Sequence, residues 1–404
     1  MVDVQEEALS ILWDLTLAEE NQKKVVEAGG ITFILGVMQR YPWVVNIQIE
    51  GCRSLANLGL AAENKRIIGE EGGVAVILHT MQRHNFVADL QVKGYWALMN
   101  LATDINTRRI EEAGCTAVIL RAMNKHELNI DVGRGGRWAL EELTINEENS
   151  RKIGEAGGIE DILRGMQQHK LMANVQQKGC GALAKFLLDD ENRKILGEKG
   201  GTVVILQAMY IHESVADVQR EGCWVLSILA KSQEIRRRTV EEGGVGVLLR
   251  AMRQLELVAD VQIAGCRALK KLAARSEENA QIAEAGGIHV LRAMQRHELD
   301  ADVQKEGCWV LKNLSRSSNE IDKKIGRAGG IVVVLHAMYR HEMVANVQTE
   351  GCRALRNLAE NNDDENRKKI DRAGGIARIL RSMQQHELIA NVQLRGCSAL
   401  CEQQ

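Results

Sequence analysis

Residues 307–314 read Gly-Cys-Trp-Val-Leu-Lys-Asn-Leu, and residues 351–358 read Gly-Cys-Arg-Ala-Leu-Arg-Asn-Leu. The glycine that opens both stretches belongs to a series that recurs every 42 to 45 residues, and a second glycine series has the same spacing. A fixed period of this size predicts a solenoid, in which each unit buries its apolar face against its neighbours. The first series is Gly51, Gly94, Gly136, Gly179, Gly222, Gly265, Gly307, Gly351 and Gly396; the second is Gly29, Gly72, Gly114, Gly157, Gly200, Gly243, Gly286, Gly329 and Gly374.

Composition agrees with a solenoid and argues against several other classes of protein. Hydrophobic residues make up 45% of the 404 residues, which is enough for a continuous core. The formal net charge of −2 gives no general attraction to nucleic acid or to an anionic membrane. No apolar run reaches the roughly 18 residues of a membrane span, so we expect no membrane insertion. Residues 1–20 lack a basic region, so we expect no signal peptide.

Seven of the nine cysteines occupy one position in the repeat. Equivalent positions on stacked helices lie about 10 Å apart, whereas a disulfide requires Cα atoms within about 7 Å. We therefore expect free thiols that are buried as small apolar residues, in the cytoplasm or, alternatively, the nucleus. Their spacing does not fit zinc, and we expect no metal or other cofactor. The seven are Cys52, Cys180, Cys223, Cys266, Cys308, Cys352 and Cys397.

Residues 274–317 illustrate one unit of the repeat. Residues 276–285 predict a short helix, and Gly286-Gly287 predicts a break after it, because glycine adopts positive φ at little cost. Apolar residues at steps of three predict a second helix over 288–298. An apolar stripe over 302–314 predicts a third and longer helix. Each unit is therefore expected to contain three helices.

The third helix shows two recurring features. An Asn or Asp precedes its first apolar residue and is expected to be the N-cap, so that its replacement by Ala costs about 1 kcal/mol. The helical glycine costs about 1 kcal/mol relative to Ala, which predicts a close helix crossing where a Cβ atom would clash. The expected N-caps are Asn46, Asp89, Asp131, Asn174, Asp217, Asp260, Asp302, Asn346 and Asn391.

These patterns resemble the armadillo repeat over essentially the whole chain. The stretches that carry the resemblance are Glu-Ala-Gly-Gly-Ile at 155–159 and 284–288, Gly-Tyr-Trp-Ala-Leu-Met-Asn-Leu-Ala at 94–102, and residues 307–314 and 351–359. The resemblance implies an all-α fold, a right-handed α-solenoid with three helices per repeat. The two-helix HEAT pattern is the nearest alternative. The chain departs from the family because no proline lies early in the second helices.

The repeat also predicts the organisation of the chain. Asp3-Val4-Gln5 matches Asp217-Val218-Gln219, so residues 1–20 are expected to be the third helix of a partial repeat. Neither end has the polar cap usual in solenoids, so we expect a fragment of a longer protein. Nine repeats are expected at about 21–62, 63–105, 106–147, 148–190, 191–232, 233–275, 276–318, 319–362 and 363–404.

The resemblance implies that the third helices line a concave groove that binds an extended peptide. In the family a Trp and an Asn four residues later face the peptide, and the chain has this pair twice, at Trp96 with Asn100 and Trp309 with Asn313. The central repeats lack the Asn, which argues against continuous binding by an Asn ladder. The expected groove residues are Arg53, Asn57, Trp96, Asn100, Trp138, Lys185, Trp224, Arg267, Lys271, Trp309, Asn313, Arg353 and Asn357.

Charges on the expected groove indicate the kind of partner. Lysines and arginines gather in the central repeats, and glutamates lie towards the C-terminal end. This pattern favours a protein or peptide segment with an acidic centre, and a solvated face with scattered charges is the alternative. The residues concerned are Lys178, Lys185, Arg267 and Lys271, with Glu221 between them, and Glu306 and Glu350.

No motif in the chain points to catalysis. One histidine per repeat, as in His84 and His297, is too widely spaced for a shared metal and is expected to cap the second helix. Residues 236–238 are Arg-Arg-Arg, either a nuclear signal or a solvated helix face. Trp43, beside Pro42, is either an exposed contact or a local plug. We therefore expect no enzyme.

The function expected from the sequence is that of a protein–protein interaction scaffold that binds an extended segment in the groove. One alternative is the regulatory armadillo region of a larger kinase or GTPase. A second is a nuclear-transport adaptor, and a third is a structural role in self-assembly. We expect no nucleic-acid partner, and the sequence predicts no oligomeric state.

Overall fold

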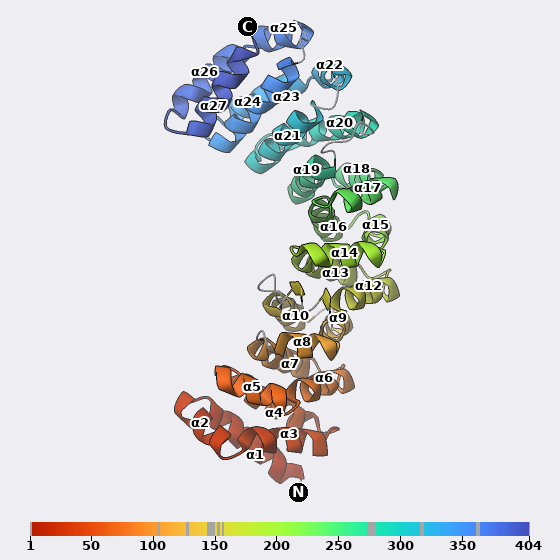
Figure 1. The fold of residues 1–404 in the computed structure, drawn as a ribbon, viewed down its shortest axis with the longest axis vertical. Coiled ribbons are helices and arrows are strands. Elements are labelled where there is room, and N and C mark those ends of the chain that lie inside the picture. Colours follow the sequence, from red (N-terminus) through yellow and green to blue (C-terminus); the bar gives the residue numbers. More distant parts are fainter. Residues whose placement is uncertain are drawn as a thin grey trace. The chain divides into compact units, whose positions relative to one another are not determined.

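The computed structural model of the chain describes residues 2–102, 106–126, 129–143, 150–151, 154–155, 157–272, 280–315, 319–360 and 364–403. Helices joined by short turns make up these residues, and no strand occurs among them. They form two compact units, Met1–Ala208 (unit 1) and Met209–Gln404 (unit 2). Each unit is a series of packed helices, which confirms the all-α solenoid (Figure 1).

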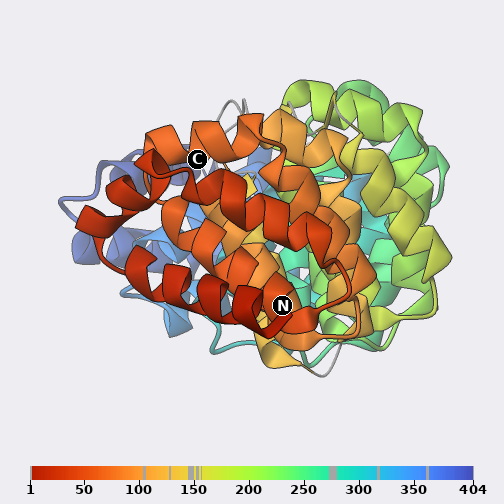
Figure 2. The same ribbon diagram turned by 90° about the horizontal axis from the view of Figure 1, so that it is seen from below.

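In unit 1 the helices follow one another in a short, medium and long order. Third helices pack in series, α1 on α4, α4 on α7 and α7 on α10, and Figure 2 shows these layers from the N-terminal end. The helices are α1 (Val2–Thr16), α2 (Glu19–Glu27), α3 (Gly30–Arg40), α4 (Val45–Leu58), α5 (Ala62–Glu70), α6 (Gly73–Arg83), α7 (Ala88–Leu101), α8 (Asn106–Glu112), α9 (Cys115–Lys125), α10 (Ile130–Leu143), α12 (Gly158–Gln168), α13 (Ala173–Phe186) and α14 (Asp190–Glu198), and α15 (Gly201–Ile211) spans the boundary between the units.

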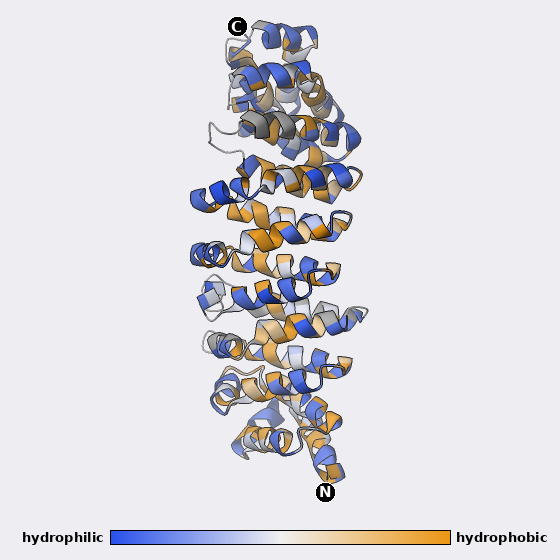
Figure 3. Cartoon of the chain, turned by 90° about the vertical axis from the view of Figure 1, so that its right-hand side faces the viewer, coloured by the Kyte–Doolittle hydropathy of each residue, from blue (hydrophilic) through white to orange (hydrophobic). Residues whose placement is uncertain are grey.

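Unit 2 repeats the same arrangement. Its third helices α16, α19, α21, α24 and α27 pack in series. Apolar and polar residues alternate along single helices, as amphipathic helices require (Figure 3). The helices are α16 (Ala216–Leu229), α17 (Gln233–Glu241), α18 (Gly244–Gln254), α19 (Ala259–Leu272), α20 (Ala280–Arg296), α21 (Ala301–Leu314), α22 (Asn319–Arg327), α23 (Gly330–Arg340), α24 (Ala345–Glu360), α25 (Asp364–Arg372), α26 (Gly375–Gln385) and α27 (Ala390–Cys401).

The predicted glycine turns are confirmed at eight of the nine positions. Each of these glycines is left-handed, with φ between 69° and 99°, and seven of them directly precede a second helix as its N-cap. A left-handed residue reverses the chain sharply between two helices, and only glycine adopts it without a Cβ penalty. The eight are Gly29, Gly72, Gly114, Gly157, Gly200, Gly243, Gly329 and Gly374.

The ninth predicted turn is wrong. Gly286 and Gly287 lie inside the continuous helix α20, and both are buried. The nearest side-chain atoms to a Cβ built at Gly286 belong to Leu269, at 3.6 Å, so the helix packs closely on its neighbour here. Glycine tolerates the helix at a cost of about 1 kcal/mol, and close packing against apolar side chains offsets that cost. The start of the expected short helix, residues 276–279, lies outside the described residues.

The close helix crossing expected at the third-helix glycines is confirmed at all nine. A Cβ atom at Gly307 would lie 2.5 Å from Cγ of Met294, and the corresponding nearest distances at the nine glycines are 2.4 to 2.6 Å. Each partner is the methionine thirteen residues earlier, near the end of the second helix. The glycine thus lets the second and third helices of one repeat approach each other.

A glutamine that recurs at one position of the repeat joins the same two helices. Nε2 of Gln304 donates to the backbone oxygens of Met294 and His297, each at 2.8 Å. Seven other repeats make the same pair of bonds, and Gly133 stands at this position in the remaining one. The amide bonds the carbonyl of Met294 near the end of the second helix, and it adds a second donor to the carbonyl of His297, which also accepts from the backbone N–H of Asp300.

The predicted N-caps of the third helices are wrong by two residues. α7 begins at Ala88 after the N-cap Val87, so Asp89 lies within the first turn. The carboxylates there favour the positive end of the helix dipole but do not cap it. The same shift applies to Asn46, Asn174, Asp217, Asp302 and Asn391. Side-chain caps occur instead at Asn129 and Asp300, where each Oδ1 accepts two backbone N–H groups.

This shift makes a prediction at Asp300. Asp300→Ala should lower the free energy of unfolding by about 1 kcal/mol, because the first turn of α21 loses its cap. Asp89→Ala, which removes a carboxylate from the first turn of α7 but no cap, should cost less than about 0.5 kcal/mol. Urea denaturation followed by circular dichroism measures both. Equal losses in the two variants would contradict the reassigned caps.

Six of the seven predicted cysteines are buried, and Cys397 is not. Cys397 lies exposed on α27, which packs mainly on α24 and α26. All nine cysteines are free thiols. Burial raises the pKa of Cys52, Cys266 and Cys352 to about 12. These thiols are therefore neutral at physiological pH and behave as apolar core atoms.

The boundaries between repeats stay a prediction. Those expected at 105, 147, 275, 318 and 362 fall outside the described residues. Among the helices that are described, none has the length and apolar character needed to cross a membrane.

Candidate binding face of the third helices

Large aromatic side chains stand half-exposed at one register of successive third helices. Trp96 on α7 and Trp138 on α10 are 49% and 48% exposed in unit 1, and Trp224 on α16 is 50% exposed in unit 2. The residues next to Trp96 in the sequence, Tyr95 and Ala97, are fully buried. In α7, α10 and α16 the aromatic residue therefore lies on the outward stripe of the helix. We call the residues at this register and four residues later the third-helix face.

The asparagines of this face bond neighbouring helices. Nδ2 of Asn100 donates to the backbone oxygen of Ala56 at 2.8 Å, and Nδ2 of Asn357 donates to that of Lys312 at 2.8 Å. Asn57 donates in the same way to Oγ1 of Thr16, at 3.2 Å. Each amide thus links one third helix to the preceding one.

This bonding changes the role expected from the resemblance. Asn357 is only 8% exposed, so it does not belong to the exposed face. Asn57 and Asn100 are half-buried and keep one amide hydrogen and Oδ1 for other partners. Asn313 is half-buried, and no such bond to a described residue is found for it.

The other expected residues divide between exposed and covered positions. Lys185 on α13 and Lys271 on α19 are exposed, and so is Arg267. Arg353 is half-buried and pairs with Glu350 at 2.6 Å. Ile228, which follows Trp224 by four residues, is buried, and the side chain of Glu142 lies outside the described residues.

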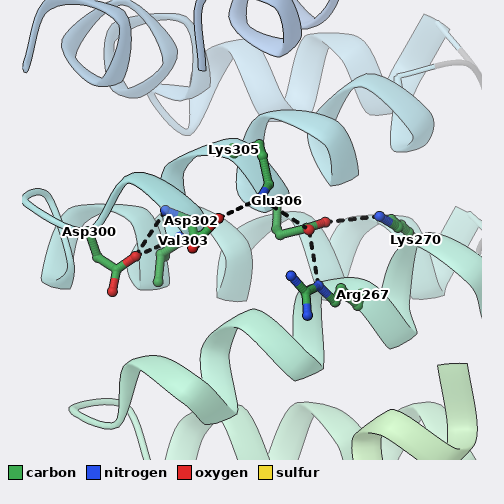
Figure 4. A network of polar contacts seen from close by, with 7 residues as sticks. All are labelled: Arg267, Lys270, Asp300, Asp302, Val303, Lys305 and Glu306. Atoms are coloured by element: carbon green, nitrogen blue, oxygen red, sulfur yellow. Dashed lines mark hydrogen bonds and ion pairs between the residues drawn. The ribbon is translucent and has the colours of Figure 1, made fainter. Parts of the chain in front are cut away.

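Glu306 on α21 lies three residues before Trp309 and forms an ionic group with Arg267 of the third-helix face and with Lys270 (Figure 4). Oε1 of Glu306 accepts from Nε of Arg267 at 3.0 Å, and Oε2 accepts from Nζ of Lys270 at 2.9 Å. The side chain of Glu306 is only 5% exposed, whereas that of Arg267 is 50% exposed. Burial alone would raise the pKa of Glu306, but the hydrogen bonds and charges of Lys270 and Arg267 outweigh it and lower that pKa. The carboxylate therefore stays charged and joins α19 to α21.

Three more glutamates lie, like Glu306, three residues before the tryptophan register of their helices, and each is paired within the protein. Glu50 bonds Arg53 at 2.9 Å, and Glu350 bonds Arg353 at 2.6 Å. Glu221 bonds Arg220 at 2.9 Å. Glu221 and Glu350, which the sequence placed among the charges of the expected groove, are thus neutralised by neighbouring arginines.

The repeated histidines cap helices and join neighbouring repeats. His84 is the C-cap of α6, and its Nε2 lies 2.8 Å from the backbone oxygen of Pro42. Because a carbonyl oxygen only accepts, this nitrogen carries the proton. His297 makes the same contact with Glu256, also at 2.8 Å. Within the described residues, no cluster of three His, Cys, Asp or Glu side chains could hold a metal ion.

Comparisons with known proteins agree with this architecture. A family model described as LRRK2 ARM repeat matches residues 109–286, less than half of the chain. This match and the repeated helical fold are consistent with an armadillo-type repeat family. A crystal structure of an engineered protein is similar over 100% of this chain and 96% of that chain, with 25% identity and a TM-score of 0.71. A second engineered protein is 24% identical over 61% of this chain and 96% of its own, with a TM-score of 0.54. The search of the curated proteins found no match.

Sequence reasoning missed the lysines that cover the aromatic residues of these armadillo repeats. Nζ of Lys93 lies 4.9 Å from the ring centroid of Trp96. Trp309 lies between Lys270 and Lys312, whose Nζ atoms are 3.7 and 5.0 Å from its ring centroid. Two of these lysines are three residues from their tryptophan, a spacing that faces side chains together on a helix. That spacing was the available signal, whereas Lys270 comes from the preceding armadillo repeat.

Proposed function

We propose that the chain is a non-catalytic scaffold whose third-helix face binds an extended protein segment. The observation that supports this most strongly is the series of half-exposed tryptophans, Trp96, Trp138 and Trp224. A monomer has little reason to expose its largest side chains at one register, and tryptophan is the residue most enriched among energetic anchors of protein interfaces. Packed third helices repeat the anchor along each unit, which suits a ligand that is itself extended.

The charges of unit 2 favour an acidic ligand. Glu306 is buried under Arg267 and Lys270, while Arg267 and Lys271 reach solvent. An incoming carboxylate at α19 would meet the exposed Arg267 and Lys271, while the exposed Asp302 of the same network is paired with Lys305 at 2.5 Å (Figure 4). We infer that the ligand has an acidic centre, with apolar side chains that pack on the tryptophans.

The bonds of the asparagines favour recognition through side chains. Because Asn100 donates to Ala56 and Asn357 to Lys312, these amides hold neighbouring repeats together. The ligand is therefore bound through tryptophan surfaces and cations, with a smaller part for its backbone. A segment that is disordered before binding loses entropy on contact, which lowers the affinity per unit of buried area.

Of two other candidate functions, the first fits the exposed charges less well, and the second is compatible with the proposed function. A nuclear-transport adaptor would bind basic peptides, and the exposed Lys185, Arg267 and Lys271 oppose such ligands. A regulatory region of a larger kinase or GTPase would use the same face, so this function is compatible with the proposed one.

A peptide selection tests the proposal. Unstructured peptides selected from a random display library on the purified chain should be enriched in Asp and Glu beside aromatic or aliphatic residues. Trp224→Ala combined with Lys271→Ala should weaken the selected peptides at least about tenfold, because an aromatic anchor and a cation are lost.

The matched control removes one exposed aromatic residue and one exposed lysine from other surfaces of unit 2. Tyr339 on α23 is 56% exposed, and Lys368 on α25 is also exposed. Tyr339→Ala with Lys368→Ala should leave the affinity within about twofold. Enrichment of basic peptides, or equal losses in both double variants, would contradict the proposal.

A further inference from the structure

The loops between the second and third helices carry exposed apolar residues at their tips. In unit 1 these tips are Trp43, Phe86 and Leu171, which are 74%, 74% and 75% exposed. Trp43 is thus an exposed residue and not a plug. We call residues 41–44, 84–87 and 169–172 the loop edge of unit 1; the tip at Leu128 lies outside the described residues.

Hydrogen bonds from histidine side chains to backbone oxygens show that neighbouring loops of this edge lie side by side. Nε2 of His84, at the start of the second loop, bonds the backbone oxygen of Pro42, directly before Trp43, at 2.8 Å. Nε2 of His126 bonds the backbone oxygen of Asn85, directly before Phe86, at 2.8 Å. Trp43 and Phe86 therefore project from adjacent loops of one edge.

Each of the two aromatic tips has a cation over its ring. The guanidinium carbon of Arg83 lies 4.1 Å from the ring centroid of Trp43, and Nζ of Lys125 lies 3.8 Å from that of Phe86. Neither cation forms an ion pair with a described carboxylate. Within the residues that the structure describes, the edge thus combines apolar tips with positive charge that no carboxylate neutralises.

The corresponding edge of unit 2 has the same shape but different charge. Its tips Leu257 and Leu299 are both 73% exposed. The arginines beside them are paired with the loop glutamates: Glu256 with Arg296 at 3.4 Å, Glu298 with Arg340 at 3.4 Å, and Glu342 with Arg381 at 3.3 Å. Unit 2 therefore supplies an internal comparison in which the cations are already neutralised.

We propose that the loop edge of unit 1 binds the surface of an anionic lipid bilayer. Tryptophan and phenylalanine at protruding tips fit the interfacial layer of a membrane, where an apolar ring and a polar neighbour are both accommodated. Arg83 and Lys125 lie where they would meet lipid phosphates, and charge near an anionic surface is attractive. The contact is peripheral, and it uses a surface distinct from the third-helix face.

Vesicle co-sedimentation of the full chain tests this inference. The chain should bind vesicles of phosphatidylcholine with phosphatidylserine, bind vesicles of phosphatidylcholine alone much more weakly, and be released by salt. Trp43→Ala with Phe86→Ala should reduce binding about tenfold. Arg83→Ser with Lys125→Ser should reduce it about fivefold or more. Trp43, Phe86 and Lys125 are exposed and Arg83 is half-buried, and circular dichroism checks that the helices remain in both variants.

The matched control is Leu257→Ala with Leu299→Ala, which should change vesicle binding by less than about twofold. No binding to anionic vesicles would overturn the inference, and so would equal losses in the unit 1 and unit 2 variants. Binding to a soluble acidic peptide but not to vesicles would assign the edge to a protein partner and also overturn it.

Discussion

Gly307→Val should lower the free energy of unfolding by about 3 kcal/mol, because the new side chain enters space already filled by Met294. A Cβ atom alone would lie 2.5 Å from Cγ and 2.6 Å from Sδ of that methionine. The clash involves the middle of the Met294 side chain and not its end, so a rotation of the terminal methyl group does not relieve it. Urea denaturation of the purified chain measures the loss.

Two further variants test the cause of this loss. Met294→Ala in the Gly307→Val background should make the combined loss smaller than the sum of the single losses, because the valine fills part of the cavity. Gly246→Ala, in the second helix α18, should stabilise the chain by about 0.5–1 kcal/mol, since no atom lies within 4 Å of the added Cβ. Additive losses would mean that the valine acts independently of Met294 and would contradict the close crossing as the cause. Destabilisation at Gly246 would show that replacing a helical glycine is costly even without a clash, which would also contradict that cause.

Glu306→Gln should lower the free energy of unfolding by about 2–3 kcal/mol at neutral pH. The change removes the charge that holds Arg267 and Lys270, and Lys270 is left nearly buried, with only 12% of its side chain exposed. The estimate lies below that for a fully buried pair because Arg267 is half-exposed and solvent screens it. Glu63→Gln, which breaks an exposed pair with Arg66, should have a much smaller effect, because solvent screens both charges.

The contribution of Glu306 should depend on pH in a defined direction. Its folded-state pKa lies below the ordinary value of 4.5. Its stabilising effect is therefore complete above the ordinary pKa and is lost as pH falls through the lower folded-state value. The stability difference between wild type and Glu306→Gln should shrink as pH is lowered from neutral towards the acid range. A difference that grows on acidification would contradict the assignment of charge to Glu306.

The sequence predicted the parts of the fold that depend on a single residue type. Gly307 and its equivalents indicated the close crossing because only a missing Cβ explains a glycine inside each third helix. The helix starts were less predictable, because an acidic residue favours both the N-cap and the first turn. Gly286 illustrates the same ambiguity, since glycine permits a left-handed turn but does not require one. Packing against the neighbouring helices decides that position.

The candidate site depended on contacts between repeats, which the sequence of one repeat does not contain. The register of Trp96, Trp138 and Trp224 was readable, and their exposure agrees with it. The burial of Glu306 and the bond from Asn100 to Ala56 were not readable, because both join residues about forty positions apart. The net charge of the chain also did not indicate the positive charges of the loop edge, because it sums the charges of all residues.

Photo-crosslinking of a selected acidic peptide tests the central claim, that the third-helix face binds the ligand. A photoreactive phenylalanine analogue replaces Trp224 in one variant and Tyr339 in another, and mass spectrometry locates the cross-links. The account predicts that the peptide is captured from position 224 and not from position 339. Capture from position 339 alone would place the ligand on the second helices and contradict the account.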